Sequence, residues 1–430
     1  MGSLHKMESS DIISNLPEQV IGTILVHLPI RDAVGTSLLS KNWRYKWTSI
    51  PNLVFNEDNI CSSTTDKNLR TYKLMNFVDR FLLNHSGSIY KFELISSYYL
   101  QGSVIDSWIR FLSRNGVKEI VLQFSTEKRY EVHSSFFSCE AICCMSLFRC
   151  ILKPPPMFKG FRDLRSLILE RVTLADEVLE SMISSCTVLE IIRLIQLKGC
   201  SCIKICAPIL QHFYFEGVFS DICIIDAPHL SFVFISLDAN VVDKPVGRGE
   251  FSNLVSVLGC LTALEKLVIC DYFMEFLAMG NLPNRLPVTY DCLKSISLEV
   301  NLEDLNHALV MLCLFQSSPN LQELEMVVST TKSYILAYED VATEYIEDFW
   351  IAHGRLNCSM NQLLMVTIKM LGERLQLGFI EYILANSPVL EMLSINHISE
   401  GKVEESRVLK ELLRFQRASA KAQVEYNLNL

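Results

Sequence analysis

The chain has 430 residues, of which 50% are hydrophobic, and its formal net charge is −9 at pH 7. This length suits one extended domain or two to three compact ones, and the composition predicts a large buried core. The negative charge argues against a general nucleic-acid-binding protein, and no apolar run is long enough to cross a bilayer.

The amino terminus and the cysteines indicate a cellular compartment. Residues 1–11 are polar and lack the apolar core of a signal peptide, so we expect no secretion. The fifteen cysteines are then expected to be reduced, buried thiols. We therefore expect a protein of the nucleus, the cytoplasm or both.

Residues 11–50 predict three short helices. Asn15 can cap the first helix, and Pro17 fits its first turn because the missing N–H would be unpaired there. Pro29 ends it. One broad apolar face runs along it at helical spacing, made of Val20, Ile21, Ile24, Leu25 and Leu28.

The second and third helices complete this small unit. Asp32 can cap the second, and the third, from about Ser40, places Trp43 and Trp47 on one side. Three short helices in about forty residues cannot build an adequate core alone. No cysteine precedes Cys61, so a protein partner is expected. The alternative is a helical hairpin that packs only on its own C-terminal neighbour.

This segment resembles an F-box. The matching features are the Leu16-Pro17 start, the Leu28-Pro29 break, the Asp32-Ala33-Val34 restart and the stretch Leu39-Ser40-Lys41-x-Trp43-Arg44. The resemblance implies docking onto the Skp adaptor of a cullin-based ubiquitin ligase. It also implies that eight residues form or directly support the adaptor interface: Leu16, Pro17, Ile24, Leu25, Leu28, Pro29, Val34 and Trp43.

Helix-then-strand units recur after the F-box. A polar connection is expected from Phe55 to Asn68, then a capping helix from Leu69 to Asn84. An L-x-x-L-x-L frame then begins at Ile89, Val117, Ile142, Leu164, Leu189, Leu210, Leu230, Leu264, Leu293, Leu321, Leu363 and Leu390. Most intervals lie in or near the leucine-rich-repeat range of about 20–29 residues. The frames predict an α/β fold: an irregular leucine-rich-repeat solenoid with a parallel sheet.

The last part of the chain looks like the plant FBD domain. The resemblance rests on Phe349-Trp350, Cys358, Leu363-x-x-Val366-x-Ile368, Phe379-x-x-Tyr382 through Ile395, Leu409-x-x-Leu412-Leu413, and the alternating Val424, Tyr426 and Leu428. Together the three regions resemble the plant F-box/FBD/LRR-repeat proteins. The expected domains are a flexible N-terminus (1–10), the F-box (11–51), a linker and capping helix (52–84), the solenoid (85–345) and the FBD region (346–430).

No catalytic motif stands out in the sequence. It contains no P-loop, no G-x-S-x-G elbow and no H-E-x-x-H. Cys200, Cys202 and Cys206, with His212 farther on, are the densest group of metal-binding residue types. The alternation of Cys202 and Cys206 with isoleucines favours a strand over a zinc site. We therefore expect no enzyme activity, no metal and no cofactor.

The resemblance implies a substrate receptor that presents a target protein to a ubiquitin ligase. One alternative is an adaptor-bound scaffold whose partners are not degraded. Another is a stacking platform for single-stranded nucleic acid, built from Lys41, Trp43, Arg44, Tyr45, Lys46 and Trp47. The net charge of −9 disfavours that platform.

The repeat frames also predict where a target binds. The fourth and sixth residues of each frame should point into the core, so the third and fifth should face outward from the concave sheet. In three consecutive repeats these outward positions are Ile191 and Arg193, His212 and Tyr214, and Phe232 and Phe234. Exposed aromatics beside an arginine are typical of binding hot spots. The alternatives are a register shifted by one residue, or a loop from Val241 to Gly249 that folds over the patch as extra core.

Overall fold

The computed structural model describes residues 13, 16–62, 65–238, 252–329, 349–350, 352, 360–371, 377–398 and 405–429. Residues 1–10, the expected cap Asn15, the loop from Val241 to Gly249 and Cys358 lie outside this described part. The chain divides into two compact units, Met1–Cys186 and Thr187–Leu430. This division falls within the range 85–345, which the repeats predicted as one solenoid.

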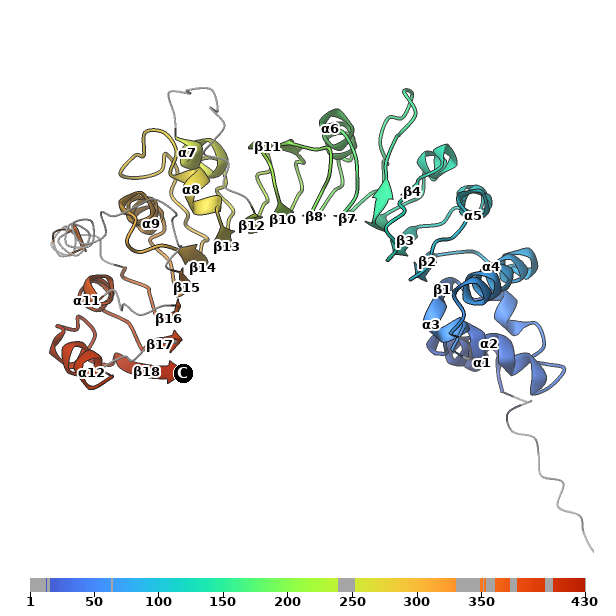
Figure 1. Ribbon diagram of the computed structural model, residues 1–430, viewed down its shortest axis with the longest axis horizontal. Coiled ribbons are helices and arrows are strands. Elements are labelled where there is room, and N and C mark those ends of the chain that lie inside the picture. Colours follow the sequence, from blue (N-terminus) through green and yellow to red (C-terminus); the bar gives the residue numbers. More distant parts are fainter. Residues whose placement is uncertain are drawn as a thin grey trace, which may run out of the picture. The chain divides into compact units, whose positions relative to one another are not determined.

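The first unit contains the N-terminal helices and five stacked repeats. Its main elements are α1 (Glu18–His27), α2 (Ile30–Gly35), η1 (Thr36–Leu38), η2 (Lys46–Ser49), β1 (Asn52–Asn56), α3 (Glu57–Ile60), α4 (Lys67–Asn84), β2 (Lys91–Ser96), α5 (Gly102–Arg114), β3 (Glu119–Phe124), β4 (Tyr130–Glu131), η3 (Ser134–Ser138), β5 (Cys144–Phe148), β6 (Cys150–Ile151), β7 (Ser166–Glu170) and α6 (Asp176–Ser184). Strands β1, β2, β3, β5 and β7 pair in that order, all parallel (Figure 1).

The second unit continues the same design. Its elements are β8 (Ile191–Ile195), β9 (Cys202–Cys206), β10 (His212–Gly217), β11 (Asp221–Asp226), β12 (Phe232–Leu237), α7 (Asn253–Leu258), β13 (Lys266–Asp271), α8 (Phe273–Leu277), β14 (Ser295–Val300), α9 (Leu305–Ser317), β15 (Glu323–Ser329), β16 (Met365–Leu371), α11 (Leu377–Asn386), β17 (Met392–Ile398), α12 (Glu405–Arg414) and β18 (Gln423–Asn429). Strands β8, β10 and β12 to β18 form a parallel sheet in that order, and β9 pairs with β11 behind it.

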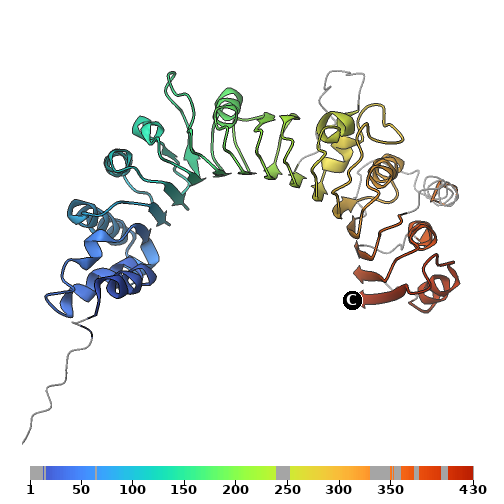
Figure 2. The ribbon, with the colours of Figure 1, turned by 180° about the vertical axis from the view of Figure 1, so that it is seen from behind.

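The repeat frames are confirmed, since each leads into a strand of the parallel sheet. In the frame that begins at Leu210, for example, Phe213 and Phe215 are buried while His212 and Tyr214 are not. Within each unit the helices between successive repeat strands lie on one side of the sheet, whereas the F-box helices lie at its end (Figures 1 and 2). We call the opposite side, which carries the outward residues, the open face.

Three details of the F-box prediction are wrong. Pro17 precedes α1 as its N-terminal cap residue and does not lie in its first turn. Asp32 does not cap α2, because Pro29 is the residue that precedes this helix and Asp32 lies in its first turn. The expected third α-helix is a series of turns followed by the 3₁₀ helix η2. Trp43 reaches the core from the turns, so its burial does not require a continuous helix.

The predicted polar connection from Phe55 to Asn68 is also wrong. Strand β1 ends at Asn56, and α3 follows it directly, with the Asn56 side chain accepting a hydrogen bond from the Asp58 amide. The buried carboxylate of Glu57 then accepts hydrogen bonds from Arg70 Nε and Ser96 Oγ, both at 2.8 Å. The first strand of the sheet therefore begins directly after the F-box.

Candidate functional site

The F-box has a small core of its own. Ile21 and Leu25 on α1 are buried against Ala33, Trp43 and Ile50. The Trp43 indole Nε1 donates a hydrogen bond of 3.0 Å to the carbonyl of Ile13, which ties the N-terminal segment to this core. A core this small leaves much of the apolar surface of the segment uncovered.

The other apolar residues of α1 lie in solvent. Val20 is 42% exposed and Ile24 is 36% exposed, although both belong to the apolar face predicted from the sequence. Leu38 is 89% exposed and Leu39 is also exposed, and neither was predicted as an interface residue. Apolar residues gathered in solvent on one small domain are typical of a protein-binding surface.

The eight residues predicted for the adaptor interface fall into three groups by exposure. Leu25 and Trp43 are buried in the F-box core, and Leu16, Leu28 and Val34 are half-buried. Pro17, Ile24 and Pro29 are exposed. The buried pair can support an interface only indirectly, whereas the exposed residues are free to make contacts.

The same geometry argues against the stacking platform for nucleic acid that the sequence left as an alternative. Trp43 is only 2% exposed, and the indole of Trp47 packs on Phe81 with ring centroids 5.0 Å apart. Tyr45 is the exposed aromatic of that stretch. Consecutive stacking of bases needs several exposed rings, so these residues do not form a platform.

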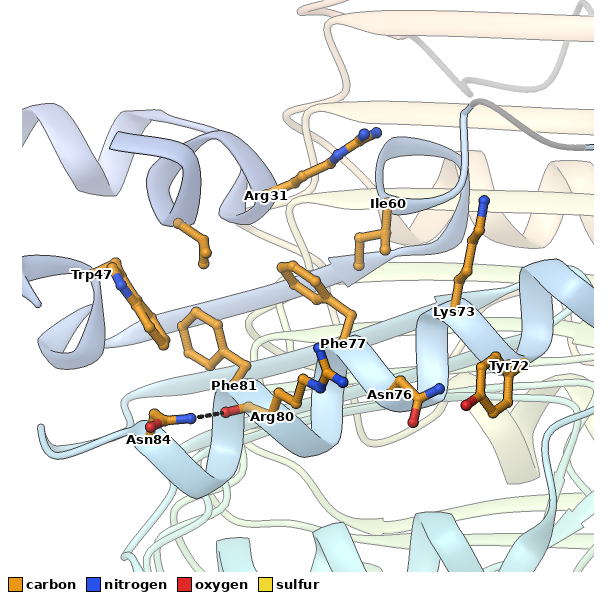
Figure 3. A pocket seen from close by; sticks show the side chains of 11 residues that line it. Arg31, Trp47, Ile60, Tyr72, Lys73, Asn76, Phe77, Arg80, Phe81 and Asn84 are labelled. Carbon is orange, nitrogen blue, oxygen red and sulfur yellow. Dashed lines mark hydrogen bonds between the residues drawn. The ribbon is translucent and has the colours of Figure 1, made fainter. Parts of the chain in front are cut away.

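A groove of about 610 Å³ lies between the F-box and α4. Figure 3 shows Phe81 of α4 beside Trp47 of the F-box, with Phe77 and Arg80 farther along the same helix and Arg31 on the F-box side. Its remaining lining residues are Val34, Ile60, Tyr72, Lys73, Asn76 and Asn84. Aromatic rings line the groove together with the cations Arg31, Lys73 and Arg80, a combination that suits an apolar side chain flanked by carboxylates.

The residues predicted to bind a target lie side by side on the open face of the second unit. His212 on β10 is in register with Ile191 on β8 and with Phe232 on β12. Two residues farther along, Tyr214 is in register with Arg193 and Phe234. The register is the predicted one, and the loop that could cover these residues lies outside the described part of the chain. We call these six residues the aromatic ladder.

The side chains of the ladder contact one another across the strands. The rings of Tyr214 and Phe234 stack with centroids 4.1 Å apart and an interplanar angle of 4°. The Arg193 guanidinium lies 4.4 Å from the Tyr214 ring centroid, in a cation–π contact. The Tyr214 hydroxyl donates a hydrogen bond of 2.9 Å to Glu216, and burial together with this bond raises the pKa of Tyr214 to about 12. The ladder is therefore a preformed surface.

Carboxylates gather at the strand ends beside the ladder, a feature that the sequence analysis missed. Asp238 directly follows β12, and burial together with the charges of Glu216 and Asp271 raises its pKa. Burial, followed by the charges of Glu299 and Asp271, raises the pKa of Cys270 to about 11. Each carboxylate lies at or next to the carboxyl end of its own strand, and only the pairing of the strands brings them together.

The cysteine group expected to be structural lies on and around β9. Cys202 and Cys206 are the end residues of this strand, whose burial alternates as predicted. Among the described residues, the group whose ligand atoms could share an ion is instead Glu119, Cys143 and Cys144, with those atoms within 4.8 Å of one another. Three ligands are one fewer than a structural zinc site requires.

The helices of the described residues are too short or too polar for a membrane span.

Two protein-family models match the chain. The F-box domain model matches residues 13–55, and the model of the LRR repeats of FBD-associated F-box protein At5g56370 matches residues 105–326.

Curated relatives match the chain over nearly its whole length. The F-box/FBD/LRR-repeat protein At1g13570 of Arabidopsis thaliana is 38% identical over 418 residues, which cover 97% of this chain and 98% of that protein. F-box/LRR-repeat protein 13 and F-box/FBD/LRR-repeat protein At1g78750 of the same plant are 27% and 28% identical, each over 96% of both chains. The chain belongs to the plant F-box/FBD/LRR-repeat protein family.

Proposed function

We propose that the chain is the non-catalytic substrate-recognition subunit of a Skp–cullin–F-box ubiquitin ligase. The observation that carries this proposal is the exposed apolar face of α1, where Val20 and Ile24 lie in solvent beside a core that does not use them. An F-box binds a Skp-type adaptor in general, and through the adaptor this chain would join a cullin. We place this assembly in the nucleus, the cytoplasm or both.

The role of such a subunit is to bring reactants together. The repeats hold the target while another subunit of the complex carries the ubiquitin thioester. Holding both in one assembly raises the effective concentration of target lysines beside that thioester. No catalytic group is required of this chain, in agreement with the lack of catalytic motifs in its sequence.

We further propose that the aromatic ladder binds the target protein. Stacked aromatics beside an arginine combine apolar area with a directional charge, the residue types in which binding energy concentrates. The stack of Tyr214 on Phe234 and the cation–π contact of Arg193 already hold these side chains in place. Binding would therefore cost little side-chain entropy.

The change Ile24→Asp tests the adaptor interface without disturbing the F-box core. It should weaken binding of a recombinant Skp-type adaptor by about 2 kcal/mol or more, because a charge would replace an apolar anchor of the interface. The matched control is Leu83→Asp, an equally apolar side chain that is 84% exposed on α4. Calorimetry with both variants measures the difference, and undiminished adaptor binding by Ile24→Asp would contradict the proposed interface.

Degradation of the target is tested separately. A protein that co-purifies with the chain should accumulate when the proteasome is inhibited. In cells that express only the Ile24→Asp variant, its level should already be high and should no longer respond to the inhibitor. A co-purifying protein whose level does not respond to the inhibitor would instead indicate the scaffold role.

A further inference from the structure

A pocket of about 240 Å³ lies at the carboxyl ends of β13 and β14. Strand β13 is the neighbour of β12, the last strand of the aromatic ladder (Figure 1). Its lining residues are Asp271, Tyr272, Glu275, Glu299, Val300, Asn301 and His307. Pockets for drug-sized ligands measure about 300–1,000 Å³. A smaller pocket suits a single side chain or a ligand of that size.

The lining carries negative charge and includes neither lysine nor arginine. Burial raises the pKa of Glu275, and the nearby charges of Asp304, Glu299 and Asp271 raise it further. The Glu275 Oε2 atom is buried and accepts no hydrogen bond among the described residues. A cation in the pocket would relieve this repulsion and would give the buried oxygen a donor.

His307 limits what kind of cation can bind. It is only 3% exposed, and its Nδ1 accepts a hydrogen bond of 3.1 Å from the Asn301 amide. The lone pair is therefore on Nδ1, and the proton of the neutral ring is on Nε2. Burial lowers the pKa of His307, which keeps the ring neutral.

The protonated Nε2 has no hydrogen-bond partner among the described residues, and Glu275 Oε1 lies 3.7 Å from it. A nitrogen that carries a proton cannot be a metal ligand. The acceptors that the pocket offers are carboxylates, among them the buried Glu275 Oε2, and they match an organic cation whose N–H groups donate. The His307 N–H, for which such a cation has no acceptor, excludes this ring as a metal ligand.

The strand register places this pocket within reach of a segment bound on the ladder. Phe234 pairs with Val268, and Leu237 pairs with Asp271, which lies at the end of the same strand β13. Three residues along a strand span about 10 Å and one strand spacing adds about 5 Å across, a separation of about 11 Å. An extended peptide covers that distance in about three residues.

We propose that this pocket receives a lysine or arginine side chain of the target, about three residues away from an apolar side chain that lies on the aromatic ladder. The inference rests on the proposed target site and names its chemistry: an extended segment with one apolar and one basic anchor. We call the pocket the cation pocket.

The first test uses the full chain alone, with no adaptor and no target. Histidine rings labelled with ¹³C are followed by NMR, and the His307 signal is assigned from its loss in His307→Gln. Butylguanidinium chloride should shift that signal in a saturable manner, whereas the uncharged isostere butylurea should not. The double change Glu275→Gln, Glu299→Gln should weaken the guanidinium binding at least tenfold and leave the melting temperature undiminished.

The control variant is Glu119→Gln, which removes a carboxylate from the first unit and should leave the titration unchanged. No saturable shift with butylguanidinium, or an equal shift with butylurea, would overturn the cation pocket. Because adaptor and target are both absent, this outcome is independent of whether the chain joins a ubiquitin ligase.

The second test asks whether pocket and ladder act together. The acetylated and amidated peptide Trp-Ala-Ala-Arg should bind at least tenfold more tightly than butylguanidinium, and the same peptide with Gln for Arg should lose that gain. Phe234→Ala and Glu275→Gln should each remove it as well. If the peptide binds no more tightly than butylguanidinium or free spermidine, the pocket takes a free amine and the proposed role in target binding is wrong.

Discussion

The indole of Trp47 and the ring of Phe81 pack with their centroids 5.0 Å apart, and this contact joins the F-box to α4. The same junction is closed by the Thr48 carbonyl, which accepts hydrogen bonds from the amides of Ser86 and Gly87. Gly87 lies so close that an added Cβ would be 2.9 Å from the Ser49 backbone. We therefore expect the F-box and the first repeats to unfold together, because contacts from the same chain add to the small F-box core.

Phe81→Ala should destabilise the F-box and α4 together. Phe81 is buried against Trp47, Phe55 and Phe77, so its loss leaves a cavity and should cost about 3–5 kcal/mol. Denaturant unfolding measures the change, with an F-box tryptophan as the fluorescent probe. Leu83→Ala, an exposed position on the same helix, should change stability by less than about 0.5 kcal/mol. An F-box transition that does not move in Phe81→Ala would show that the two parts fold separately.

Phe232→Ala, Phe234→Ala should abolish binding of the target and preserve binding of the adaptor. Both side chains are half-buried on the open face, and the strand core beneath them is formed by Val233 and Ile235. Affinity purification of the variant, with the melting temperature recorded in parallel, checks both expectations. A large drop in melting temperature would mean that the pair is core and that the ladder is not a binding site.

His307 should make the folded chain less stable as the pH falls below neutral. Burial lowers the pKa of His307 in the folded chain below its ordinary value of 6.5. As the pH falls through that value, the unfolded chain takes up a proton at this ring before the folded chain does, so stability decreases. In His307→Gln, whose side-chain oxygen can still accept from the Asn301 amide, this part of the decrease should be missing.

The measurement compares denaturant unfolding of wild type and variant between pH 7.5 and pH 5.5. Glu275 acts in the opposite sense because its pKa is raised, so the difference between the two proteins is the quantity to follow. His229→Gln, at an exposed position, is the control. Parallel curves for wild type and His307→Gln would contradict the assignment of a neutral, buried ring.

A fragment of residues 1–399 should aggregate. Strand β18 pairs with β17, and the Ser419 hydroxyl donates a hydrogen bond of 2.7 Å to the Leu390 carbonyl. Without this cover the last repeat loses its neighbour, and repeat arrays need a cap at each end. Size-exclusion chromatography and thermal melting check the outcome. A soluble fragment with a cooperative melt would show that the C-terminal residues are dispensable.

The strands of the repeats could be predicted from the sequence because their signal is local. Alternating apolar residues such as Phe213 and Phe215 mark the buried face without reference to the rest of the chain. The same signal was present for β1, where Ile50, Leu53 and Phe55 fit the repeat frame. This strand is hard to recognise in the sequence because its residues follow the F-box directly and fit the end of that domain as well.

The cation pocket could not be predicted, because its residues meet only through the stacking of irregular repeats. Asp271 is the last residue of β13, Glu299 is the penultimate residue of the neighbouring β14, and His307 comes from α9, the helix that follows β14. The intervals between frames vary, so the sequence alone does not show which strand ends adjoin. The aromatic ladder could be predicted from the sequence because its three repeats are regular and consecutive.

Behind the ladder the repeats contain the strand pair β9 and β11 where neighbouring repeats contain helices (Figure 1). In the described residues the backbone is therefore hydrogen-bonded between strands both at the ladder and behind it. Amide hydrogens there should exchange with solvent only in rare openings of the whole unit. A target would meet a surface that is already rigid, so association should not wait for a rearrangement of this chain, and differences among targets should appear in their dissociation rates.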